Sequence, residues 1–280
     1  MSRYFMNAVT PALILVLAAG RADALAAQES GVEPPSDGLA LSIPCTSFDD
    51  DSHYPLGYGK TLDLAIQAVH LGRAQPEKET RKCFFRMGQA LARHLVFENP
   101  NDSEPRYWYA AAMALRAAEE GGRTQVGLAQ RAHEQARLAL TIAPDHAGAQ
   151  HVLGRLHAAV MRLSGLKRFI ATKILGGKAL SGASWETAES FLAAAARLQP
   201  EVPTHHYELG ALYLDTDRPE LALAAFGRAL ACAPIHLADR EVQGRAEEMV
   251  ERLLRGEPEE EARQRATHFR GGRRRIGGHR

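Results

Sequence analysis

Two prolines that lie 34 residues apart, Pro200 and Pro234, constrain the fold of this chain more than any other feature. Each follows an alanine-rich segment with helical periodicity, and small and aromatic residues stand at fixed positions between them. These positions are Leu209, Gly210, Tyr213, Ala222, Phe226, Ala229 and Pro234. Small residues let two antiparallel helices approach closely, and aromatic residues fill the space between neighbouring pairs. The spacing therefore predicts helix pairs that stack on one another.

Parts of the same pattern precede this repeat. The pair that ends at Pro200 has matching residues at Leu153, Gly154 and Ala188. About 22 extra residues separate the two helices of that pair. Two further pairs end at Pro144 and Pro100, and the pair before Pro100 is degenerate. Residues 237–254 are expected to form a terminal helix that covers the last repeat.

The predicted fold class is all-α. Aromatic residues make up only 6% of the chain, and the abundant alanine is the strongest helix former and a poor strand former. The repeat positions resemble those of tetratricopeptide repeats. We therefore expect a tetratricopeptide-like helical-repeat solenoid of about four helix pairs with a C-terminal capping helix. Asp217 and Glu220 are predicted to form a capping box for the second helix of the last pair.

The chain is expected to have four parts. Residues 1–26 have the layout of a secretory signal peptide, because a basic residue and an apolar stretch precede an Ala-x-Ala end. Cleavage is expected after Ala24 or Ala26, which predicts export, to a bacterial periplasm. The other parts are a flexible lead-in, the repeat domain and a disordered arginine-rich tail, at residues 27–57, 58–254 and 255–280.

Three cysteines remain after such a cleavage, so at least one thiol stays free or pairs between chains. In an oxidising compartment Cys45 and Cys83 could form a disulfide, and the alternative of free thiols stays open. Cys232 lies in an apolar helical stretch and is predicted to be a small core residue.

Three stretches follow one another in an unusual order. They are His151-Val-Leu-Gly-Arg155, an insertion that contains Leu166-Lys-Arg168, and Trp185-Glu-Thr-Ala188. This order, followed by one regular repeat, resembles the regulator of microtubule dynamics family and its bacterial relatives over roughly residues 80–250. The resemblance implies a helical-repeat scaffold that binds partners and has no catalytic residues to carry over. The chain differs from animal members in its export signal and in having no anchoring span.

Catalysis, metal binding and nucleic-acid binding find little support in the sequence. His133-Glu134 begins a zinc-protease motif, but Arg137 stands where the second histidine is needed. The twelve histidines are not spaced to put several on one helix face. We expect no metal, no cofactor and no enzymatic activity. The 34 Lys and Arg are balanced by 33 Asp and Glu, which argues against binding of nucleic acid along the whole chain.

The insertion, residues 162–183, carries apolar residues at helical spacing among basic ones. A basic amphipathic helix of this kind can bind an anionic membrane or a partner helix. The favoured interpretation is that the insertion extends the preceding helix and packs on the solenoid.

The concave groove is the predicted binding site. In this architecture the first helix of each pair lines the groove at four fixed positions, which selects Arg106, Tyr109, Met113, Arg116, His151, Arg155 and Tyr207. A basic and aromatic lining suits an acidic peptide or a chain terminus. We therefore expect an exported scaffold or adaptor for a protein or peptide. The alternative is a carrier that holds an acyl chain or another apolar ligand between the insertion and the groove.

Overall fold

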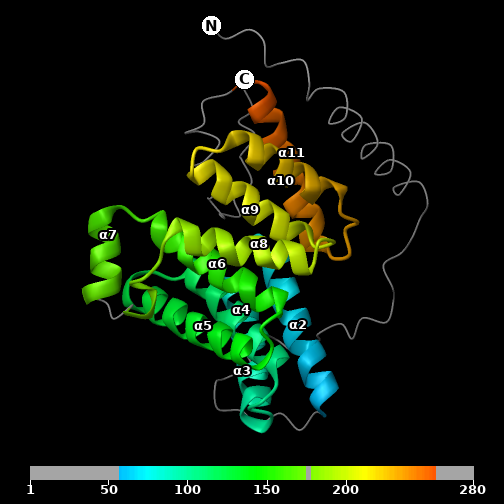
Figure 1. The fold of residues 1–280 in the computed structure, drawn as a ribbon. Coiled ribbons are helices and arrows are strands. Elements are labelled where there is room, and N and C mark those ends of the chain that lie inside the picture. The colour runs from blue at the N-terminus through cyan, green and yellow to red at the C-terminus, as the bar shows by residue number, and fades with distance from the viewer. Residues whose placement is uncertain (1–56, 175–177, 257–280) are drawn as a thin grey trace, which may run out of the picture.

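The computed structural model describes residues 57–174 and 178–256. Over these ranges the chain contains helices and turns and no strand. The helices form a helical-repeat solenoid, in which each packs against its neighbours in sequence (Figure 1). The predicted signal peptide lies outside the described residues, as do nearly all of the predicted lead-in and tail. No helix in the described ranges is long and apolar enough to cross a bilayer.

Four antiparallel pairs and one further helix build the solenoid. The pairs are α2 (Tyr58–Ala74) with α3 (Lys78–Glu98), α4 (Ser103–Glu119) with α5 (Gly122–Ile142), α6 (Ala147–Met161) with α8 (Trp185–Leu198), and α9 (Pro203–Asp215) with α10 (Pro219–Ala231). The last helix, α11 (Leu237–Leu254), packs on both α9 and α10. The prediction of four pairs and a capping helix is confirmed.

A glycine in the first helix permits the close approach within three of the pairs. A β-carbon on Gly210 would lie 2.7 Å from the ring of Phe226, nearer than side chains pack. The equivalent distances are 2.6 Å from Gly154 to Leu192 and 2.6 Å from Gly72 to Phe85. In the α4–α5 pair, the fully buried Ala110 of α4 belongs to one core cluster with Leu128 and Ala132 of α5. The repeat thus rests on one recurring contact between a small residue and a large one.

Several helix starts carry a side-chain cap, as their sequences favour. The side chains of Asp102, His146 and Ser184 accept backbone N–H bonds at the starts of α4, α6 and α8. The capping box predicted from Asp217 and Glu220 is wrong. The helix α10 begins at Pro219 without a side-chain cap, because Asp217 adopts a left-handed conformation (φ 57°) one residue before the N-cap position.

The solenoid curves until its first helix meets its last one. The rings of His70 in α2 and His236 at the start of α11 lie 4.2 Å apart between centroids. At the end of α2, the Nη2 of Arg73 donates to the Oγ1 of Thr204 in α9 at 3.4 Å. The helix α2 therefore contacts the first turns of α9 and α11, and the concave side is closed at that end.

The insertion leaves the stack. The helix α6 ends at Met161, and the short helix α7 (Gly165–Phe169), the π-helical turn η2 (Ile170–Ile174) and the 3₁₀ turn η3 (Lys178–Leu180) follow. Figure 1 shows α7 projecting from the side of the solenoid. Leu166 is 71% exposed and Phe169 55% exposed. The favoured prediction, an extension of α6 that packs on the solenoid, is therefore wrong for this segment. Leu180 of η3 returns to the core, and Ala183 packs against the same cluster.

Two cysteines lie in the described residues. Cys83 is buried in α3 and disulfide-bonded, while Cys45, its predicted partner, lies outside the described residues. Cys232 is a free thiol and is partly exposed. The prediction that it belongs to the core is wrong, because α10 ends at Ala231 and Cys232 occupies the C-cap position.

Candidate functional site

A cleft of about 850 Å³ lies between α2, α4 and α6 and the first turns of α9 and α11. It is partly enclosed, because α2 contacts both α9 and α11 at one end. Two groups of side chains line it. The polar group includes His70, Arg73, His151, Arg155, Thr204 and His205. The apolar group includes Trp108, Ala111, Leu115, Ala118, Leu156 and Ala159.

The walls of the cleft are single faces of α4 and α6. In both helices the lining residues recur every three or four positions, as one face of a helix requires. The lining residues include Glu104, Tyr107, Trp108, Ala111, Leu115 and Ala118 in α4, and Gly148, His151, Val152, Arg155, Leu156 and Ala159 in α6. The first turns of both helices carry the polar residues and the last turns the apolar ones. The cleft is therefore polar at the end that α2 closes and more apolar beyond it.

Arg73 lies at the polar end of the cleft. It is largely buried, and burial and the neighbouring charge of Arg155 lower the pKa of its guanidinium. Its contact with Thr204 uses one of its five N–H donors. No ion pair joins Arg73 to a carboxylate in the described part of the chain. A buried guanidinium without a counter-ion is costly, so this position favours an anion.

Two buried histidines meet beside Arg73. The Nδ1 atoms of His151 and His205 lie 3.0 Å apart, and the Nε2 of His205 lies 3.2 Å from the Oε1 of Gln199. The amide oxygen can only accept, so Nε2 of His205 carries a proton and its Nδ1 accepts from His151. Burial lowers the pKa of His205 to about 4 and that of His151 well below its usual value. Both rings are therefore neutral at pH 7.

Three other charged groups that line the cleft have partners. Arg155 pairs with Glu208 at 3.1 Å, and Arg162 pairs with Asp215 at 2.7 Å. Glu104 accepts from Trp108 and from the Nε2 of His146, and the His146 contact is the main reason that its pKa is lowered. Arg73 differs from these groups in having no counter-ion.

Two of the seven predicted groove residues, His151 and Arg155, line the cleft. The prediction is wrong for Met113 and Tyr207, which are fully buried core residues. Arg106, Tyr109 and Arg116 do not line the cleft and contact neighbouring helices instead. Arg106 donates to Gln135 of α5, and Arg116 donates to Gln89 of α3.

The error in α4 has a geometric cause. Arg106, Tyr109 and Met113 are each two residues beyond the lining residues Glu104, Tyr107 and Ala111, which is a rotation of about 200° around a helix. The first-helix pattern assigns Trp108, Ala111 and Leu115 to packing positions, but these residues line the cleft. A register that uses these three residues for packing therefore selects the opposite face of α4 for the groove.

Sequence reasoning missed Arg73, because α2 belongs to the degenerate pair and was assigned no groove positions. It also treated the adjacent His205 and His206 only as candidate metal ligands. The structure pairs His205 with a histidine 54 positions away. Among the described residues, no group of three or more His, Cys, Asp or Glu side chains is placed to hold a metal.

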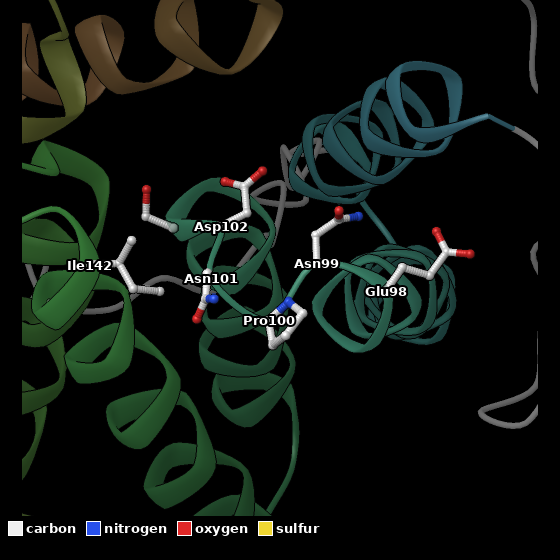
Figure 2. Close-up of a pocket in the computed structure, with 7 residues that line it drawn as sticks. Glu98, Asn99, Pro100, Asn101, Asp102 and Ile142 are labelled. Carbon is white, nitrogen blue, oxygen red and sulfur yellow. The ribbon is translucent and has the colours of Figure 1, made fainter.

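A second, more open hollow of about 480 Å³ lies at the turn between α3 and α4, and Figure 2 shows its lining from Glu98 to Asp102 with Ile142. Asp102 has a structural role there, because one of its carboxylate oxygens caps α4 and the other accepts a hydrogen bond from Tyr58. Among the other lining residues, the side chains of Glu98, Asn99 and Asn101 point in different directions (Figure 2). We therefore assign the functional site to the cleft.

A comparison with known protein families gives a match. The family model described as RMD1-3, regulator of microtubule dynamics protein 1-3, matches residues 60–254. The match spans all four helix pairs and α11. No curated protein sequence matches the chain.

Proposed function

The chain belongs to the regulator of microtubule dynamics family, and from that premise we propose that it is an exported adaptor that binds a segment of a partner protein in its cleft. The observation that carries this proposal is Arg73, a guanidinium held in the cleft without a counter-ion. The repeats are proposed to be of the tetratricopeptide type, since three pairs share the glycine contact. A bacterial origin is part of the same proposal.

Binding rather than catalysis is the proposed activity. Four titratable groups of the cleft are engaged with one another: His151 with His205, and Glu104 with His146. Burial keeps the two paired histidines neutral and held in one hydrogen-bonded arrangement. Such pairs shape a binding surface, and neither of the two is free to activate a nucleophile.

Export is supported by two separate features. The first 26 residues have the layout of a signal peptide. Cys83 is disulfide-bonded, which fits an oxidising compartment such as the periplasm. Amino-terminal sequencing of the protein from its native host tests the proposal. The expected first residue is Leu25 or Ala27, and an intact Met1 would contradict export.

One observation favours a second candidate, a carrier for an acyl chain or another apolar ligand. The far half of the cleft is lined by the apolar residues of α4 and α6, with Leu163 at the start of the insertion. These side chains would accept a hydrocarbon chain as well as the side chains of a peptide. A lipid extract of the purified protein separates the candidates, since a carrier is expected to retain ligand in stoichiometric amount.

Blocking the cleft tests the adaptor directly. Ala159 is exposed and lines the cleft, so Ala159→Trp fills the cleft without disturbing the core. Ala224→Trp on the exposed face of α10 is the matched control. Partner capture from a native-host extract is expected to be lost with Ala159→Trp and kept with Ala224→Trp. Equal capture by both folded variants would place the binding surface elsewhere.

A further inference from the structure

We infer that the cleft captures the carboxyl terminus of its partner chain, with Arg73 pairing with the terminal carboxylate. This inference rests on the proposed adaptor function and specifies the ligand. A chain terminus and an internal acidic segment differ in whether they fit the closed end of the cleft. Three features of that end support it: its closure, its charge and the length of cleft beyond it.

The closed end of the cleft favours the end of a ligand chain over an internal segment. Arg73 stands where α2 meets α9 and α11, as its contact with Thr204 and the His70–His236 contact show. An extended chain that enters along α4 and α6 meets packed helices at this point. A terminus can stop there, whereas an internal segment would have to turn back within the cleft.

The charged side chains at the closed end of the cleft limit how many negative groups a ligand can place there. Arg155 pairs with Glu208, and the neighbouring His151 and His205 are neutral, so Arg73 is left as a guanidinium with no ion pair of its own at this end. The carboxylates of Glu104, Glu201 and Asp239 also line the cleft and disfavour a ligand with several negative charges. A guanidinium pairs bidentately with one carboxylate, which matches a terminus without further acidic residues.

Local geometry adds to this anchor. The helix α9 begins at the cleft without a side-chain cap, so the positive end of its dipole stays available to an anion. The hydroxyl of Thr204 accepts from Arg73 and holds the guanidinium in place. The anchor therefore combines a fixed guanidinium with a helix start.

The length of the cleft sets the length of the ligand. Its lining runs along α4 from Glu104 to Ala118, which is about 20 Å at 1.5 Å per residue. An extended peptide rises about 3.3 Å per residue, so roughly six residues fit. The first positions before the terminus face polar side chains, and the next ones face the apolar walls. The preferred ligand is a free terminus preceded by small or apolar residues.

Affinity selection from a random hexapeptide pool tests the inference. One pool carries free carboxyl termini and the other carries the same sequences as amides. The wild-type protein is expected to retain free-acid peptides at least tenfold more than amides. Arg73→Gln is expected to abolish this preference. Arg131→Gln, on the exposed face of α5 and outside the cleft, is the matched control and is expected to keep it.

The inference is overturned if folded Arg73→Gln keeps the preference for free acids, and two further outcomes also overturn it. Equal retention of acids and amides, blocked by Ala159→Trp, would leave an adaptor that binds internal segments. If the protein retains neither peptide pool and binds sodium laurate instead, the result would support the carrier and contradict the adaptor as well. If Arg73→Gln fails to fold, the acid-to-amide ratio of the wild-type protein decides, and Arg73→Lys is expected to keep part of the preference.

Discussion

The helices α6 and α9 begin neighbouring pairs and share the same glycine contact, yet their inner faces lie in different surroundings. His151 in α6 lines the cleft, while Tyr207, at the equivalent position of α9, is 1% exposed. The cause is α11, whose Val242, Ala246 and Val250 cover that face. Arg245 of α11 donates to the hydroxyl of Tyr207 at 2.8 Å. The repeat fixes how two helices pair, and the curvature of the solenoid fixes which inner faces stay open.

The largest expected loss of stability comes from truncating Tyr207, the side chain that α11 covers. Tyr207→Ala leaves a cavity under α11 and is expected to lower the free energy of unfolding by about 3–5 kcal/mol. His151→Ala, at the equivalent position of α6, is expected to cost less because that position borders the cleft. Urea unfolding followed by circular dichroism compares the two variants. A larger loss for His151→Ala would contradict the contrast between the covered face and the open one.

The glycine contacts sharpen the comparison, since they are expected to be equal in the two regions. Gly154→Ala and Gly210→Ala each place a β-carbon inside contact distance of a packed side chain, at an expected cost of about 1–3 kcal/mol. Gly127→Ala in α5 is the control, because its β-carbon would meet no atom within 4 Å. It is expected to stabilise the helix by about 0.5–1 kcal/mol. Thermal unfolding of the three variants measures these differences.

The paired histidines make the open region sensitive to acid. His205 has a folded-state pKa of about 4, below its unfolded value of about 6.5, so the unfolded chain binds more protons between these values. Stability is therefore complete above about pH 6.5 and declines as the pH falls towards 4. At pH 5 we expect a loss of roughly 1–2 kcal/mol from this group. His205→Gln should flatten the dependence of the melting temperature on pH, and an unchanged slope would mean that the pair does not form.

The smallest effect on stability is expected at Arg155. Its pair with Glu208 is partly exposed, so Arg155→Ala should change the free energy of unfolding by less than about 1 kcal/mol. The same change releases Glu208 beside Arg73 and is expected to weaken capture of a free peptide terminus. Parallel measurements of melting temperature and peptide retention separate the two effects. A large drop in stability with unchanged peptide retention would mean that Arg155 stabilises the fold and does not contribute to ligand capture.

How far the sequence predicts this molecule depends on the distance over which each feature is determined. The glycine contacts at Gly154 and Gly210 and the covering helix over 237–254 follow from local spacing, and the structure has them. The equivalent contact of Gly72 was missed because its pair departs from the repeat.

The closure of the cleft could not be read from the chain. It brings Arg73 to Thr204 across 131 positions, through small rotations that add up over four pairs. Those rotations depend on helix lengths and side-chain packing, and no sequence motif predicts them. For the same reason the pairing of His151 with His205 left no signal in the spacing of the histidines.

Contact between α2 and α11 is the central claim, because it closes the cleft, positions Arg73 and accompanies the covering of α9. A direct test places cysteines at His70 and His236 in a Cys232→Ser background and treats the protein with a short thiol cross-linker. The close contact of the two rings predicts an efficient link, which peptide mapping would locate between α2 and α11. A control with cysteines at His70 and Ala224 should not link. Failure of the His70–His236 pair to link in a folded protein would mean that the solenoid is open and would contradict this account.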